Sequence, residues 1–172
     1  DAVLLSFDVE FNRALTSVNL LYNELGGGAP AIVAAAKQQG KIKTLCGIKS
    51  GQAEIDLRWK GGQKMLGAPD AVLLSFDLEF NRALKSADFS GNNIGDEGTA
   101  ALSEALKTNS TLETLELRSN KVGAAGAQSL AGMLQVNRAL KKLILNENNI
   151  CDEGTSALGE ALKSNNTLET LE

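Results

Sequence analysis

Residues 112–123 read LETLELRSNKVG, and residues 140–151 read LKKLILNENNIC. The same phrase stands at residues 84–95 as LKSADFSGNNIG, and it begins again at residues 168–172 as LETLE. In each complete phrase the first, fourth, sixth and eleventh positions are apolar. Alternation over the fourth to sixth positions is typical of a short strand with one buried face. The sequence therefore predicts one short strand in every 28 residues.

A helical pattern follows each complete phrase. Leucines recur in two columns that lie four residues apart, a spacing that marks one buried face of a helix. The first column is Leu74, Leu102, Leu130 and Leu158, and the second is Leu78, Leu106, Leu134 and Leu162. We therefore expect each strand to be followed by a helix whose leucines face a common core.

Polar residues and glycines recur in the same frame. Position nine of the phrase is asparagine, whose amide can bond the main chain where the strand gives way to a turn. Asp96 and Asp152 begin two helical stretches, where a carboxylate caps a helix N-terminus or favours its first turn. Glycines are expected at the turn into each helix. The asparagines are Asn92, Asn120 and Asn148, and the glycines are Gly98, Gly126 and Gly154.

The first half of the chain follows this frame less regularly. Residues 15–26, LTSVNLLYNELG, form a phrase, and APAIVAAAKQQ at 29–39 is its predicted helix. TLCGI at 44–48 begins another strand that no helix follows, so we expect an irregular insert near residues 45–65 that includes GGQKM at 61–65. Residues 1–15 and 70–84 differ only at Val9 and Leu78, which predicts equivalent helices in a duplicated 69-residue unit. We expect residues 1–172 to be a single array of about five to six repeats, truncated at both ends.

The phrase L-x-x-L-x-L-x-x-N-x-[LIV]-G followed by a helix resembles the leucine-rich repeat in its long, ribonuclease-inhibitor-like form. This form is also found in innate immune receptors and in GTPase-activating proteins for nuclear-transport GTPases. The resemblance implies an α/β solenoid, a horseshoe arc with short parallel strands on its concave face and helices on its convex face.

Composition excludes several classes of function. The net charge is −4 with no basic stripe, which argues against nucleic-acid binding, and no apolar stretch suggests direct membrane insertion. The chain has no histidine, which excludes Ser-His or Cys-His nucleophiles and His-bearing zinc sites. Gly26, Gly27 and Gly28 lack the Lys-Ser/Thr of a phosphate loop, so they are interpreted as turn glycines. We expect no enzyme activity, no cofactor and no metal. Two cysteines without disulfide spacing favour an intracellular or organellar setting over a secreted one.

Concave surfaces are where solenoids bind other molecules, so the outward strand positions are the candidate site. Stacking the repeats places Asp56, Asp88 and Glu116 in one column, and the only Tyr and the only Trp together in another. Aromatic and arginine side chains dominate interface energetics. Alternatively, the aromatics pack against the insert and the charges only solvate the sheet. The predicted partner-binding residues are Tyr22, Asp56, Arg58, Trp59, Asp88, Glu116 and Arg118.

The leading hypothesis is a non-catalytic scaffold that binds another protein through its concave strand face, within a larger chain or complex. One alternative is a peripheral structural subunit of a larger assembly, organellar or membrane-associated. Another is a regulatory module of the GTPase-activating or innate-receptor type. The GGQKM stretch is either a contact or a local loop.

Overall fold

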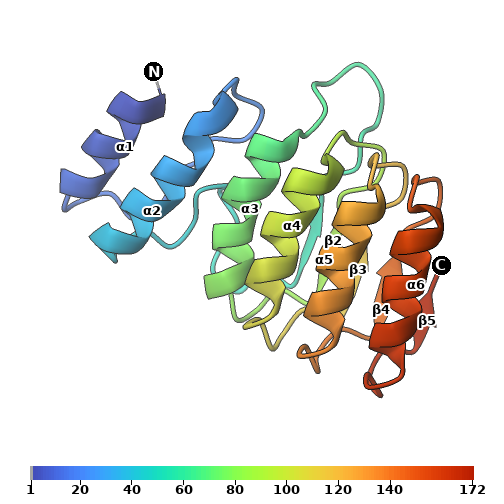
Figure 1. The fold of residues 1–172 in the computed structure, drawn as a ribbon. Helices are drawn as coiled ribbons and strands as arrows, with labels where there is room; N and C mark the ends of the chain where they lie inside the picture. Colours follow the sequence, from blue (N-terminus) through green and yellow to red (C-terminus); the bar gives the residue numbers. More distant parts are fainter. Residues whose placement is uncertain (1) are drawn as a thin grey trace.

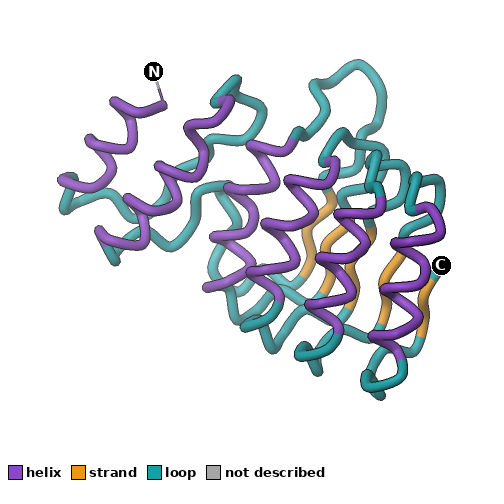
Figure 2. Tube along the Cα trace, viewed as in Figure 1, coloured by secondary structure: helices purple, strands orange, loops and turns teal. Residues whose placement is uncertain are grey.

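The computed structural model describes residues 2–172 as one sheet of short parallel strands backed by a single layer of helices (Figure 1). The five strands follow one another in sequence order, and a helix lies between each consecutive pair. The strands lie behind α3 to α6, whereas loops replace them behind α1 and α2 (Figure 2). The elements are α1 Ala2–Phe11, η1 Gly26–Gly28, α2 Ala29–Gln39, β1 Glu54–Asp56, α3 Ala68–Phe80, β2 Ser86–Asp88, α4 Gly95–Leu106, β3 Thr114–Glu116, α5 Ala124–Leu134, β4 Lys142–Ile144, α6 Cys151–Leu162 and β5 Thr170–Leu171. The predicted α/β leucine-rich-repeat arc is confirmed.

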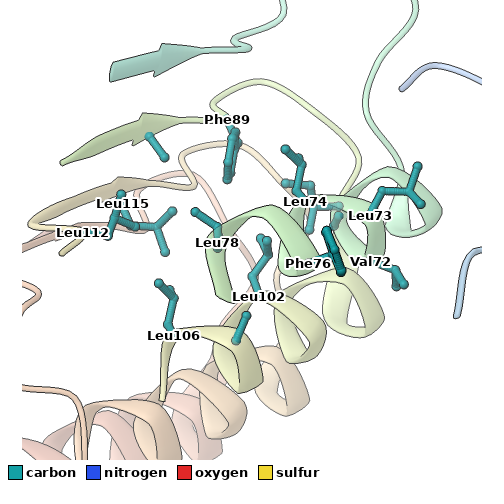
Figure 3. Packing of buried hydrophobic residues seen from close by; sticks show 14 of the residues in the cluster. Val72, Leu73, Leu74, Phe76, Leu78, Phe89, Leu102, Leu106, Leu112 and Leu115 are labelled. Carbon is teal, nitrogen blue, oxygen red and sulfur yellow. The ribbon is translucent and has the colours of Figure 1, made fainter. Parts of the chain in front are cut away.

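The core lies between the strands and the helices. The central strand residues Ile55, Ala87, Leu115 and Leu143 are paired in register and buried. The two predicted leucine columns of the helices are buried opposite them, except for the exposed Leu162 in the last helix. Figure 3 shows Leu78, Leu102 and Leu106 near Leu115 of β3 and near Leu112, which precedes that strand. Because each repeat supplies only one strand and one helix, neighbouring repeats complete each other's core.

The recurring glycines serve helix packing rather than a turn. Gly98 lies inside α4, where an added Cβ would come within 2.8 Å of the Cβ of Ala71 in α3. Gly154 in α6 is equivalent, because its Cβ would lie 2.8 Å from that of Ala127 in α5. The absence of a side chain therefore allows adjacent helices to approach closely.

The asparagines at position nine bond the main chain, as predicted, and they also join neighbouring repeats. The Asn120 amide donates to the carbonyl oxygen of Phe89 in the preceding repeat at 2.9 Å, and Asn148 donates likewise to Leu117 at 2.8 Å. A second asparagine ladder, which the sequence interpretation missed, follows the helices. Asn109 donates to Leu78 O and Asn137 donates to Leu106 O, both at 2.6 Å. Both ladders satisfy buried carbonyl groups that strand and helix bonds leave unpaired.

Asp96 acts on a different helix from the one predicted. It lies in the first turn of α4, but its Oδ1 accepts hydrogen bonds from the backbone N–H groups of Gly123 at 2.6 Å and Gly126 at 3.0 Å. These donors belong to the start of the next helix, α5. The carboxylate therefore satisfies the N-terminal donors of its neighbour.

In the N-terminal half, residues 42–48 pair with the phrase before α2 rather than with β1. Isolated bridges join Ser17 to Thr44 and Asn19 to Cys46. The segment is fixed to α3 by the buried carboxylate of Asp77, which accepts from Thr44 Oγ1 at 2.5 Å and from Leu45 N at 2.7 Å. We call residues 42–48 the irregular strand, because they form only isolated bridges and no helix follows them before β1. None of the helices within residues 2–172 is long and apolar enough to cross a membrane.

The environment of Asp77 predicts a pH-dependent stability. Burial raises its pKa from 3.8 to about 6, although its hydrogen-bond donors oppose that shift. The folded state therefore holds a proton that the unfolded state releases between pH 4 and 6, so the free energy of unfolding falls as the pH rises through that window. From the size of the shift, this contribution falls by about 3 kcal/mol.

Urea unfolding at several pH values, compared between the wild type and Asp77→Asn, isolates this contribution, which the variant should lack. Asp8 is the copy of Asp77 in α1 and is exposed, so Asp8→Asn is the matched control and should keep the wild-type pH dependence. Equal pH profiles for wild type and Asp77→Asn would contradict the prediction.

Candidate binding surface

The outward face of the sheet contains the predicted column of carboxylates. The strand register pairs Asp56 with Asp88, Asp88 with Glu116, and Glu116 with Ile144. The strands are only two or three residues long, so each contributes few outward side chains to this face. The predicted column of Asp56, Asp88 and Glu116 therefore follows three neighbouring strands, and Ile144 continues it on the fourth.

The charges on this face neutralise one another. The Arg58 guanidinium lies 3.0 Å from Asp56 and 3.2 Å from Asp88, and the Lys60 ammonium lies 3.0 Å from Asp56. The hydrogen bonds from Arg58 and then Lys60 hold the pKa of the Asp56 carboxyl well below its usual range. Glu116 pairs with the ammonium of Lys142 at 3.3 Å. A partner at these strands meets a balanced surface rather than one of a single sign.

Arg118 is likewise committed to a partner within the chain. Its guanidinium pairs with the Glu147 carboxylate, which also accepts from Ser119 Oγ at 2.6 Å. The hydrogen bond from Arg118 lowers the pKa of Glu147. Exposed ion pairs of this kind stabilise a fold little. They do fix the side chains and so shape the surface that a partner meets.

Trp59 extends the strand register beyond β1. Its backbone N–H donates to the Ser90 carbonyl at 3.0 Å, so it lies beside Gly91 as the repeat frame predicts. A Cβ on Gly91 would be 3.5 Å from the Cβ of Trp59, and the positive φ of Gly91 (72°) favours glycine there. The indole N–H donates to the Gln63 carbonyl at 3.0 Å, which ties the side chain to the GGQKM loop. Trp59 therefore contacts the insert and still exposes 41% of its surface.

A groove of about 930 Å³ runs beside Trp59 at the end of the sheet where strands turn into helices. Met65, the last residue of GGQKM, lines it with Trp59 and is 42% exposed. Polar and glycine residues from three successive repeats form the rest of the lining: Gly91, Asn92, Asp96, Ser119, Lys121, Gly123, Glu147, Asn148 and Asn149. The sequence interpretation missed this groove. The signal that could have found it was Met65, the only apolar side chain of the GGQKM stretch.

Tyr22 is not part of this groove. Its backbone has a positive φ of 64°, as Gly91, Ser119 and Glu147 do, so it occupies the equivalent turn position. However, its N–H donates to Asp70 Oδ1 at 2.6 Å, and its partly buried ring packs against the core. Burial, and then the charge of Asp70, raises the pKa of its phenol. The predicted column of Tyr22 beside Trp59 is interrupted because residues 42–48 pair with the Tyr22 phrase.

Comparison with known proteins agrees with this architecture. A family model described as "Leucine Rich repeat" matches residues 80–103, 108–131 and 136–159. Among solved structures, that of "Leiomodin-1 Actin-Binding Site 2 (ABS2)" is 22% identical, with a TM-score of 0.65 over 72% of this chain and 70% of that one. The tropomodulin C-terminal domain from Caenorhabditis elegans is 14% identical, with a TM-score of 0.50 over 95% of this chain and 92% of that one. No curated protein sequence gives a match.

Proposed function

Because this chain is built of leucine-rich repeats arranged as an arc of parallel strands and helices, we propose that it is a non-catalytic scaffold that binds another protein. The contact surface consists of the outward strand positions from Asp56 to Arg118 and the adjoining groove beside Trp59. Function on such a fold depends on the site rather than on the fold, so the proposal rests on the chemistry of this surface.

The observation that carries the proposal is the pair of exposed apolar side chains, Trp59 and Met65, that line the groove. Trp59 is held by hydrogen bonds through both its backbone and its indole nitrogen, so little side-chain freedom is lost when a partner covers it. Tryptophan is among the residue types enriched at binding hot spots. The balanced charges nearby favour contact through apolar area and hydrogen bonds over long-range attraction.

Trp59→Ala is expected to weaken partner binding at least tenfold, since truncating a hot-spot aromatic costs about 2 kcal/mol or more. The fold should persist, because the ring lies outside the core. Cross-linking of the native chain in its own extract, followed by mass spectrometry, would identify the partner, and titration calorimetry would then compare the variants.

Val136→Ala is the matched control for this experiment, because Val136 is also an exposed apolar residue but does not line the groove. It should bind as the wild type does. If Trp59→Ala bound the partner with the wild-type affinity and kept its melting temperature, the groove would not be part of the binding surface.

A second candidate is an actin-binding module. The leiomodin-1 structure is that of an actin-binding site, and its match covers 72% of this chain. The test is co-sedimentation of the purified chain with actin filaments, together with a monomer-binding assay. Binding that Trp59→Ala abolishes would make actin the partner of the groove, and absence of binding in both assays would eliminate this candidate.

A further inference from the structure

Two helices of nearly identical sequence lie in different environments. Helix α3 buries Leu73 and Phe76, which are 0% and 2% exposed. Their copies in α1, Leu4 and Phe7, are 67% and 65% exposed. The two helices have similar local geometry, because the ring centroids of Phe7 and Phe11 are 5.2 Å apart and those of Phe76 and Phe80 are 4.9 Å apart. The difference therefore arises from what lies against each helix.

The structure shows what covers this face in α3. Asp77 on that face bonds Thr44 and Leu45, and Lys37 of α2 lies 5.9 Å above the Phe80 ring. Leu73, Phe76, Asp77 and Phe80 are three to four residues apart and so share one side of the helix.

The opposite side of α3 faces α4, where Gly98 approaches Ala71. The buried face of α3 is therefore covered by the preceding unit, through helix α2 and the irregular strand after it. The corresponding face of α1 has no such neighbour among the described residues.

We propose that the exposed face of α1, formed by Leu4, Phe7, Asp8 and Phe11, is a docking face for a second copy of the 1–69 unit placed ahead of α1. The copy's α2-type helix lies over Leu4 and Phe7, as α2 and the strand after it cover Leu73 and Phe76. Its Thr44-type hydroxyl and Leu45-type N–H donate to Asp8, as they do to Asp77. The exposed face of α1 is therefore suited to the same helix and hydrogen-bond donors that already cover the equivalent face of α3 within this chain.

The neighbouring positions support the same occupant. Val9 and its copy Leu78 are both buried, and Leu5, the copy of the buried Leu74, also packs against the core, so both helices pack on the core by the same side. Asp8 is exposed, so its carboxylate is accessible to donors of the kind that Asp77 binds. Phe80 keeps 48% of its surface exposed beneath Lys37, so the docked copy should likewise leave Phe11 at the rim.

The test uses the 172-residue chain and an extended chain in which a second copy of residues 1–69 precedes residue 1. Phe7→Ala should leave the melting temperature of the original chain unchanged. In the extended chain it should lower the melting temperature as much as Phe76→Ala does. Asp8→Asn should remove a pH dependence that is present only in the extended chain. Val136→Ala should have no effect in either chain.

Two results would overturn the proposal. One is that Phe7→Ala leaves the melting temperature unchanged in the extended chain as well as in the original chain. The other is rapid proteolysis of the added unit while residues 1–172 resist digestion, which would show that the copy does not dock on α1.

Discussion

Phe76→Ala is expected to lower the free energy of unfolding by about 3–5 kcal/mol, the range for removing a large side chain from a packed core. Phe76 is among the largest fully buried side chains and lies between α3 and the preceding unit. Truncation to alanine leaves a cavity at this buried position, which adds to the loss of the contacts that the ring itself makes. Urea unfolding monitored by circular dichroism and by the fluorescence of Trp59, the only tryptophan, would measure the loss.

The chain contains its own control for this experiment. Phe7→Ala makes the same chemical change in an almost identical helix, but at an exposed position. Exposed substitutions usually change stability by less than about 0.5 kcal/mol. Similar losses for the two variants would mean that the environments of α1 and α3 do not differ as described.

Asn120→Leu is expected to destabilise the array by about 2–4 kcal/mol, since each buried polar group left without a partner costs about 1–3 kcal/mol. The Asn120 amide is buried and donates to Phe89 O at 2.9 Å and to Arg118 O at 3.0 Å. Leucine has a similar size but offers no donor, so the Phe89 carbonyl loses its cross-repeat partner. Urea unfolding, followed by circular dichroism, would measure the loss.

Asn146→Leu is the matched control, because Asn146 is exposed on the outward face only two positions from a ladder asparagine. It should leave the denaturation midpoint almost unchanged. If Asn120→Leu also left the denaturation midpoint almost unchanged, the hydrogen bonds of the ladder would not contribute to the stability of the fold.

The 28-residue periodicity predicted much of the fold because the stabilising contacts recur at the same spacing as the residues that make them. Buried leucines and position-nine asparagines recur in fixed columns, and each column corresponds to one place in the core or the ladder. The same frame placed Trp59 beside Gly91. The asparagines of the second ladder, Asn81, Asn109, Asn137 and Asn165, also recur every 28 residues, so their positions could have been found in the sequence. Their hydrogen-bond acceptors could not, because these are backbone carbonyls of neighbouring helices that only the packed structure identifies.

Features that join different repeats could not be read from the pattern. Asp96 lies at the start of one helix, and only the packing shows that it caps the next. The irregular strand at 42–48 has no repeat to align with, and it is fixed by the bonds of Asp77 to Thr44 and Leu45. That strand separates Tyr22 from the groove beside Trp59. Of the two aromatic residues predicted to share a column, only Trp59 therefore lines the groove.

The lengths of the cross-repeat bonds have a consequence for how the chain folds. In the regular repeats, the ladder bonds of Asn109, Asn120 and Asn137 each close a loop of 31 residues. Two of the bonds that join the N-terminal half to α3 are longer, because Lys37 reaches Glu79 over 42 residues and Tyr22 reaches Asp70 over 48. Shorter loops close at a smaller entropic cost and reach their contacts sooner. Refolding from denaturant should therefore nucleate among the C-terminal repeats, and the docking of the N-terminal helices on α3 should be the last step.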